Sequence, residues 1–365
     1  MMSWTPTPKR TAINTLATLW CQPAWQSSQH ADSIREILRD KADDADDVIR
    51  LHVAQVARRL SIEPEAGFGL VRDRLLVEKQ SLVATVLLWE LWDCGSDRPE
   101  EVDVVLASLV KQEPWTLLLN ETQSNSDHLE PLDIITSLAL VLAIRHQTPA
   151  AQELVRTWLS DPIATAAAQH AVGNLRAWTE LPSGQATERA RAFDMLEAAT
   201  AALAQLRHSA ADSPDQLDRI FATADLISRN INFASEAVLR SGGHPTEDRE
   251  FAARALAVLD GIAQFKHPSI THFLIEALSH LAAADPSQAF HTAATAVDTG
   301  DEYTYDSVAA AETTKFIERY LAEFREAVIA DDKLLTAIRS VLHAFVDAGW
   351  PSAISLAYRL SEAFR

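Results

Sequence analysis

Glycine is scarce in this chain, at 10 of 365 residues. Proteins on average contain about 7% glycine, and the tight turns of phosphate-binding loops depend on it. Alanine, the best helix former, makes up about one residue in six. This imbalance predicts helices joined by short connections, and it excludes most nucleotide-binding enzyme folds. No Walker-type loop and no nucleophile motif is present in the sequence, so we expect no cofactor and no catalysis.

Cysteine and long apolar runs are also scarce. Cys21 and Cys94 are the only cysteines, which excludes a disulfide framework and predicts a reducing, cytoplasmic location. The longest uncharged apolar runs, residues 82–89 and 134–144, are much shorter than the about 20 residues of a membrane-spanning helix. The bulky Trp20 directly before Cys21 argues against a lipoprotein signal. We therefore expect no membrane association.

Basic residues are fewer than acidic ones. The chain has 32 lysines and arginines and 51 aspartates and glutamates, which gives a formal charge of −19. Such a surface repels the phosphates of nucleic acids and anionic lipids. It attracts cationic surfaces instead. The charge therefore favours a protein partner with a basic surface and argues against nucleic acid.

Apolar residues recur at spacings of three and four along most of the chain. Ile49, Val53, Val56 and Leu60 are one such series. No stretch alternates with the period of two that a half-buried strand shows. Prolines that directly follow capping side chains predict helix starts, at Asp161-Pro162, Ser213-Pro214 and Asp285-Pro286. These signals predict an all-α chain of about sixteen helices in paired repeats, an α-solenoid with up to two lobes.

The composition changes near residue 150, where large apolar residues give way to alanine. We therefore predict an N-terminal helical-repeat lobe at 1–147 and an alanine-rich lobe at 148–365. A long helix hairpin is predicted at 187–240. Its second helix has apolar residues between 217 and 238 at the spacing of a coiled-coil seam. Two interpretations stay open: packing within the hairpin, which we favour, or a homodimer through 217–238.

One window resembles a HEAT repeat. An aspartate stands at a turn between helices, and an arginine follows near the start of the next helix, in the series Asp44, Ile49-Arg50, Val53-Ala54 and Val56-Ala57. The resemblance implies a HEAT/armadillo-like solenoid in which Arg50 bridges to the aspartate of a neighbouring repeat. The junctions at Asp161 and Asp285 depart from the pattern, since Ala167 and His291 stand six residues after them.

The last hundred residues resemble the helical ends of large bacterial repeat proteins. The similar features are His267-Pro268, Tyr303-Thr304-Tyr305-Asp306, Gly349-Trp350-Pro351 and Phe364-Arg365. Some of those proteins accompany ATPase or nuclease modules in phage-defence loci. The resemblance implies an accessory subunit of a bacterial multi-protein system, with a role in antiviral defence.

His272, Glu276 and His280 are the candidate metal ligands. Their spacing of four places them along one side of a helix, and histidine and glutamate are zinc ligands. The spacing differs from the His-Glu-x-x-His motif of metalloproteases, and the apolar face lies elsewhere on the helix. A polar face turned to solvent or to a neighbouring helix is the favoured interpretation, so we expect no metal site.

The candidate partner-binding residues are aromatic or basic. Trp4 stands in a Thr/Pro-rich segment, and Tyr303 and Tyr305 precede a predicted helix, where exposed aromatic rings serve as interface anchors. The basic candidates are Arg50, Arg58 and Arg72. Two of these belong to the one noticeable concentration of arginine, at Arg58, Arg59, Arg72 and Arg74, which the flanking acidic residues explain best as a solvated face.

Three functions follow in order of preference. The first is a non-catalytic solenoid scaffold that binds another protein. The second is a HEAT-like nucleic-acid-binding protein, which would need the arginines in one groove. The third is a metal-dependent enzyme that uses His272, Glu276 and His280.

Overall fold

The fold is all-helical. The computed structural model describes residues 6–60, 64–95, 97–113, 115–120, 129–244, 246–297 and 307–363, and no strand occurs among them. The prediction of an all-α chain is therefore confirmed. The described helices are more numerous than the about sixteen predicted, because several connections contain short helices that have no repeating apolar pattern of their own, such as α2 (Pro23–Gln26) and α12 (Arg176–Thr179).

The chain divides into two compact units. Unit 1 comprises residues 1–155 and 165–171, and unit 2 comprises 156–164 and 172–365. The chain thus crosses between the units more than once near residue 160. The predicted lobes, 1–147 and 148–365, stay a prediction.

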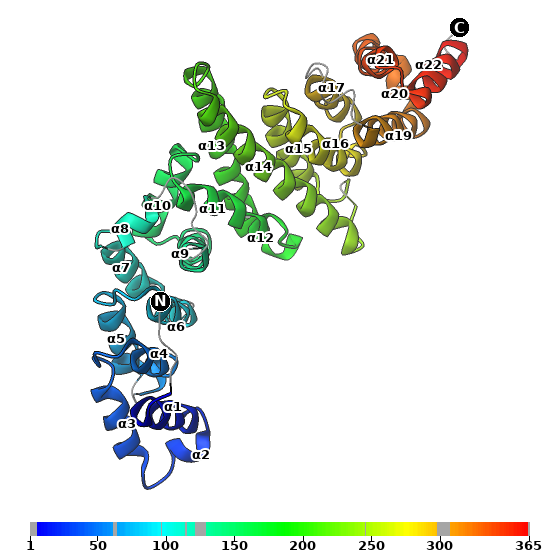
Figure 1. The fold of residues 1–365 in the computed structure, drawn as a ribbon. Helices are drawn as coiled ribbons and strands as arrows, with labels where there is room; N and C mark the ends of the chain where they lie inside the picture. The colour runs from blue at the N-terminus through cyan, green and yellow to red at the C-terminus, as the bar shows by residue number, and fades with distance from the viewer. Residues whose placement is uncertain are drawn as a thin grey trace. The chain divides into compact units, whose positions relative to one another are not determined.

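The helices of unit 1 pack on one another in chain order (Figure 1). Helix α4 contacts α1 and α6, and α6 in turn contacts α9, while α5 and α7 pack on α6. A π-helical turn, η3, continues α9. The elements are α1 (Pro8–Trp20), α2, α3 (Ala31–Asp40), α4 (Asp47–Ala54), η1 (Ala57–Leu60), α5 (Pro64–Leu75), α6 (Ser81–Gly95), α7 (Pro99–Leu109), α8 (Trp115–Leu119), α9 (Leu129–Val141), η3 (Leu142–His146), α10 (Pro149–Ser160) and α11 (Ala166–Asn174), of which the last two have residues in both units.

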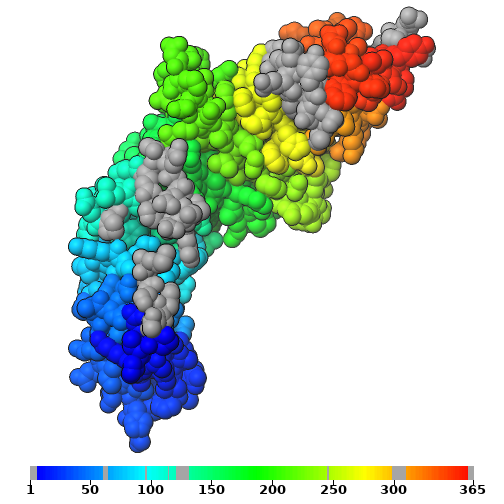
Figure 2. Space-filling model, in the orientation of Figure 1, coloured from blue at the N-terminus to red at the C-terminus, as the bar shows by residue number. Residues whose placement is uncertain are grey.

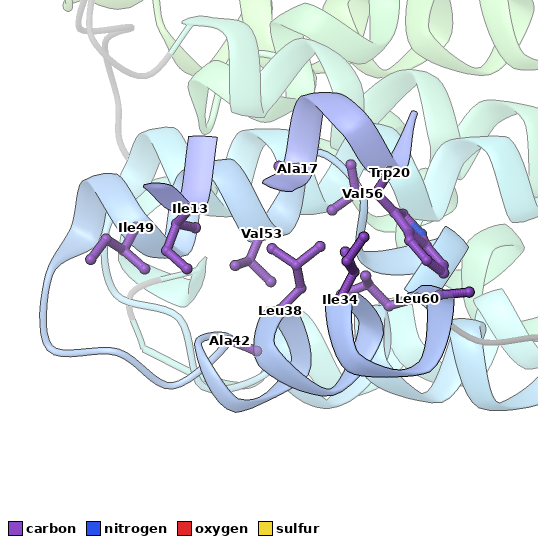
Figure 3. Packing of buried hydrophobic residues seen from close by; sticks show 11 residues of the cluster. Ile13, Ala17, Trp20, Ile34, Leu38, Ala42, Ile49, Val53, Val56 and Leu60 are labelled. Carbon is purple, nitrogen blue, oxygen red and sulfur yellow. The ribbon is translucent and has the colours of Figure 1, made fainter. Parts of the chain in front are cut away.

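An apolar core joins α1, α3 and α4 (Figure 3). Ile34 and Leu38, four residues apart, project from one side of α3 and are buried, as the spacing predicts. Trp20 closes one end of the core, and its Nε1 donates a 2.7 Å hydrogen bond to the carbonyl of Arg59. The indole N–H of this buried ring is thus satisfied.

Unit 2 consists of two layers of helices (Figure 1). One layer contains, in this order, α13, α15, α17 and α21, and each of these helices contacts the next one in the layer. The other layer contains α14, α16, α19 and α22, which contact one another in the same way. Figure 2 shows the colours of unit 2 in chain order, so neighbours in sequence are neighbours in space. The elements are α12, η4 (Ser183–Gln185), α13 (Ala186–Ser209), α14 (Pro214–Arg240), α15 (Arg249–Ala263), α16 (Pro268–Leu281), α17 (Pro286–Val297), α19 (Ser307–Glu323), α20 (Arg325–Ala330), α21 (Asp332–Asp347) and α22 (Pro351–Ala363).

Proline marks many of the helix starts in unit 2. Helices α14, α16, α17 and α22 all begin with proline, whose fixed φ suits the first helical position and which has no N–H to satisfy there. Asp161-Pro162 is an exception to the prediction, because residues 161–164 form turns and the next helix begins at Ala166. An isolated Asp-Pro pair is thus equally compatible with a turn.

The predicted seam of α14 is buried inside unit 2. Ile220, Ala224, Ile227, Ile231 and Ala234 are fully buried, and α14 packs on α13, α15 and α16. A homodimer through these residues would require α14 to leave its neighbours in the same chain.

Candidate functional site

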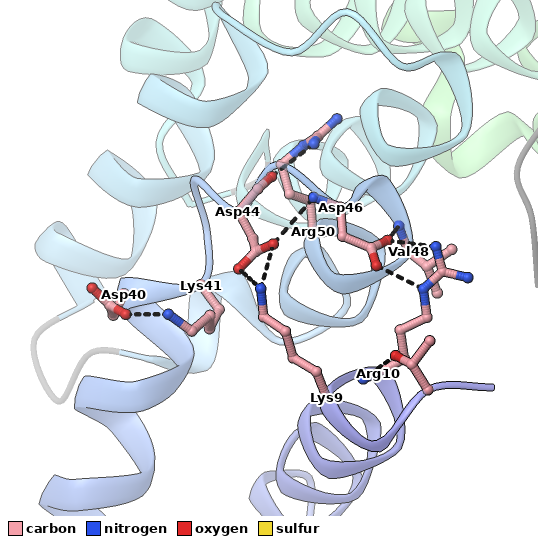
Figure 4. A network of polar contacts seen from close by, with 9 residues as sticks. Lys9, Arg10, Asp40, Lys41, Asp44, Asp46, Val48 and Arg50 are labelled. Carbon is pink, nitrogen blue, oxygen red and sulfur yellow. Dashed lines mark hydrogen bonds and ion pairs between the residues drawn. The ribbon is translucent and has the colours of Figure 1, made fainter. Parts of the chain in front are cut away.

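The Asp-Arg window of unit 1 forms a polar network (Figure 4). Asp44 accepts hydrogen bonds from Lys9 Nζ at 3.0 Å and from the backbone N–H of Asp46 at 3.1 Å. The bond from Lys9 lowers the pKa of the Asp44 carboxyl. Asp46 caps α4 through the N–H of Val48 at 3.1 Å, and it accepts two bonds from Arg10 at 2.7 and 3.0 Å. The network ties α1 to the start of α4.

Arg50 joins α4 to the next helix pair. It donates at 2.8 Å to the backbone carbonyl of Asp44, and its Nε and Nη2 donate to Glu78 at 2.9 and 3.0 Å. Glu78 is only 4% exposed and also accepts the backbone N–H groups of Lys79 and Gln80. Burial opposes ionisation, but the hydrogen bonds outweigh it and lower the pKa of Glu78. Arg50 thus bridges to a glutamate, where the resemblance implied an aspartate.

Arg58, Arg72 and Arg74 also hold carboxylates. Arg58 pairs with Asp93 at 3.0 Å and lies 3.5 Å from Glu90. Arg72 pairs with Asp73 at 2.8 Å, and Arg74 contacts Asp43. Because Arg50, Arg58, Arg72 and Arg74 each have a carboxylate partner, they do not form a groove of unneutralised charge for nucleic-acid phosphates.

Glu90 of α6 is a partly buried carboxylate with incomplete hydrogen bonding. Its Oε2 lies 3.5 Å from Nε of Arg58 but accepts no hydrogen bond from the described residues. Burial raises the pKa of Glu90, and the nearby Arg58 opposes the rise only in part. The charged form is therefore disfavoured in the folded protein.

We expect Glu90→Gln to raise the free energy of unfolding by about 1 kcal/mol at pH 7. Because the folded pKa of Glu90 lies above its unfolded value, the wild type is destabilised as pH rises through that folded pKa and Glu90 ionises. Below the unfolded pKa this penalty is absent. The stability advantage of Glu90→Gln should therefore be present at pH 7 and vanish near pH 4. Urea unfolding of both proteins at pH 4 and pH 7 measures it, and an equal gain at both values would contradict the explanation.

The three aromatic candidates for partner binding lie outside the described residues; they are Trp4, Tyr303 and Tyr305.

The three candidate metal ligands lie on α16, and two of them, His272 and Glu276, have partners on neighbouring helices. His272 Nδ1 is 2.8 Å from Glu312 Oε2 on α19, and Glu276 accepts a 3.0 Å bond from Asn232 Nδ2 on α14. Burial lowers the pKa of His280. Within the described part of the chain, no group of three or more histidine, cysteine, aspartate or glutamate side chains is arranged to hold a metal ion. The polar side of α16 therefore faces its neighbouring helices.

These contacts belong to a longer row between α14 and α16, which we call the α14–α16 strip. We define it by Asp225, Arg229 and Phe233 of α14 and by His272, Phe273 and Glu276 of α16. The guanidinium of Arg229 lies 4.8 Å from the ring centroid of Phe273, which lies 6.2 Å from that of Phe233. The guanidinium of Arg176, from α12, lies 3.8 Å from the ring centroid of Phe233. Two cations thus stack on two neighbouring aromatic rings.

Two buried acceptors on α14 lack donors. Asp225 binds Arg229 at 2.7 Å through Oδ2, while its Oδ1 has no partner among the described residues. The same holds for Oδ1 of Asn232, a 1% exposed residue whose Nδ2 donates to Glu276 of the strip. Burial raises the pKa of Asp225, although Arg229 opposes the rise. A buried acceptor without a donor costs about 1–3 kcal/mol, so the strip is costly to the folded protein.

Unit 1 exposes an apolar row on α6. Leu82 and Trp89, seven residues apart on one side of the helix, are 37% and 47% exposed, and Val86 between them is half-buried. The ring centroids of Trp89 and Trp92 are 6.4 Å apart in an edge-on arrangement. The row was not predicted from the sequence, because most large apolar residues of a helical array are expected to pack in its core. A signal was present, since apolar residues occur on all sides of α6, whereas a helix in a two-layer stack needs only one apolar face.

No family model and no curated protein matches the chain. Among solved structures, the chain is similar to the crystal structure of an engineered protein, with 17% identity over 93% of this chain and 96% of that chain and a TM-score of 0.28. Among the described helices, none has both the length and the apolar character needed to cross a membrane.

Proposed function

We propose that the protein is a non-catalytic α-solenoid scaffold that binds another protein, as an accessory subunit of a bacterial multi-protein system of the phage-defence kind. The layered packing of successive helices supports a solenoid of the HEAT/armadillo type. Such arrays present long helix faces on which a partner can lie and need no reactive group.

The exposed apolar row of α6 is the observation that carries the proposal. Tryptophan is enriched among the residues that dominate binding energy in protein interfaces. Trp89 is half-exposed and lies on a row with Leu82 and Val86, so its burial by a partner removes a large apolar surface from water. A nucleic-acid duplex would make little use of this row, because its affinity comes mainly from cationic contacts to phosphates.

Trp89→Ala is expected to reduce recovery of the partner protein at least about tenfold, because an anchor tryptophan is worth about 2 kcal/mol or more. The measurement is affinity capture from the native host with the tagged chain, followed by identification of the stoichiometric partner and titration of the purified pair. Because the chain carries −19, the pair should also weaken with salt.

Val104→Ala is the matched control. Val104 is an exposed apolar residue of α7 in the same unit, and its loss should leave partner recovery unchanged. Recovery of nucleic acid without protein, or equal binding by Trp89→Ala and the wild type, would make the proposal wrong.

A further inference from the structure

Two guanidinium groups of the chain itself are held in or beside the α14–α16 strip. Each lies over an aromatic ring and beside a carboxylate: Arg229 over Phe273 with Asp225 at 2.7 Å, and Arg176 over Phe233 with Glu180 at 2.6 Å. An aromatic face together with a carboxylate suits the planar, delocalised guanidinium better than the compact ammonium of lysine. The surroundings of Arg229 therefore form a site for an arginine side chain.

The two partners in the Arg229–Asp225 pair differ in exposure. The Arg229 side chain is 47% exposed, while Asp225 as a residue is 9% exposed. Arg229 can therefore turn into solvent, but the carboxylate cannot. Asp225 also retains the oxygen without a donor, and Asn232, seven residues further along α14, provides a second such oxygen. Unsatisfied acceptors call for a ligand that donates hydrogen bonds.

Charge around the α14–α16 strip favours a cation. Glu276 lies within the strip and Glu312 at its edge, bound to His272. The carboxylates Glu180, Asp225, Glu276 and Glu312 outnumber Arg176 and Arg229. An incoming cation thus meets an excess of negative charge, in a chain that carries −19 overall.

We propose that the α14–α16 strip binds an arginine side chain of the partner protein, which replaces Arg229 on Asp225 and Phe273. This inference rests on the proposed function, because it names a chemical group on the proposed partner. The contact lies in unit 2 and is separate from Trp89, which lies in unit 1. In the free protein, Arg229 occupies the site as an internal substitute.

The probe is a fluorescent Gly/Ser peptide with two arginines, compared by anisotropy at physiological salt with the same peptide carrying two lysines. We expect wild-type protein to bind the arginine peptide at least about fivefold more tightly than the lysine peptide. Asp225→Asn should weaken binding about tenfold, through loss of a charge-assisted bond. Arg229→Gln should strengthen it about threefold, because the internal competitor is removed.

Two variants outside the strip control for overall charge. Asp347→Asn on α21 and Arg325→Gln on α20 change exposed residues by the same charges and should alter binding less than about twofold. Equal effects of Asp347→Asn and Asp225→Asn, equal binding of both peptides, or weaker binding by Arg229→Gln would overturn the inference. Unchanged thermal midpoints of the variants exclude misfolding as the cause.

The test is separable from that of the proposed function. Trp89→Ala should bind the arginine peptide as the wild type does, because Trp89 belongs to unit 1 and the strip to unit 2. Absence of peptide binding, with partner capture still dependent on Trp89, would overturn the inference alone.

Discussion

Replacement of Glu78 by alanine is expected to lower the free energy of unfolding of unit 1 by about 3–5 kcal/mol, the usual cost of breaking a buried ion pair. The variant leaves the charge of Arg50 in a mostly buried position without its carboxylate. It also removes the acceptor of the N–H groups of Lys79 and Gln80. Hydrogen exchange of α4 and α6, measured in the full chain, should show faster opening in the variant.

Asp73→Ala is the control for this experiment. Asp73 pairs with Arg72 at a comparable distance, 2.8 Å, but both side chains are largely exposed. Exposed pairs contribute about 0–1 kcal/mol, so this variant should exchange nearly as slowly as the wild type. Similar acceleration in both variants would show that burial of Glu78 is not the reason for its contribution.

Acid should remove the contribution of Glu78. Its pKa is lowered in the folded state, so the stabilisation is present above the unfolded pKa of about 4.3 and is lost as pH falls through the lower folded value. The difference between the wild type and Glu78→Gln should therefore be large at pH 7 and shrink below about pH 4. A difference that does not depend on pH would contradict the charged pair as its source.

Local sequence signals were sufficient for the helices. The three-four spacing places Ile34 and Leu38 on one buried side of α3, and proline starts α14 and α17 where expected. Both features depend on neighbours within one or two turns, so they are visible without the fold. The short helices escaped prediction because helices of four or five residues carry no repeating pattern.

The α14–α16 strip could not be predicted in this way. Asn232 and Glu276 are 44 residues apart, and His272 and Glu312 are 40 apart. Spacing within α16 showed that His272, Glu276 and His280 share a side, but it could not show which helices would face that side. The partners are supplied by tertiary packing, which gives His272 and Glu276 separate contacts on α19 and α14.

Gly67→Ala is expected to lower the free energy of unfolding by about 1–3 kcal/mol, the cost of overpacking a close contact. A Cβ added at Gly67 of α5 would lie 2.3 Å from the backbone carbonyl oxygen of Arg58 in η1. A backbone atom cannot turn aside as a side chain can, so α5 and η1 would have to separate. Their contact buries Leu60 and Phe68, which adds to the cost.

Gly69→Ala provides the opposite expectation within the same helix. A Cβ there meets only the end of the Arg72 side chain, at 4.0 Å. Replacement of an unconstrained helical glycine by alanine stabilises a protein by about 0.4–1 kcal/mol. Thermal and urea unfolding of both variants should therefore shift in opposite directions. Two shifts of the same sign would show that α5 and η1 do not approach closely at Gly67. Since Arg58 reaches Asp93 and Glu90 from this same η1 segment, the close approach also positions the arginine that the sequence analysis assigned to partner binding.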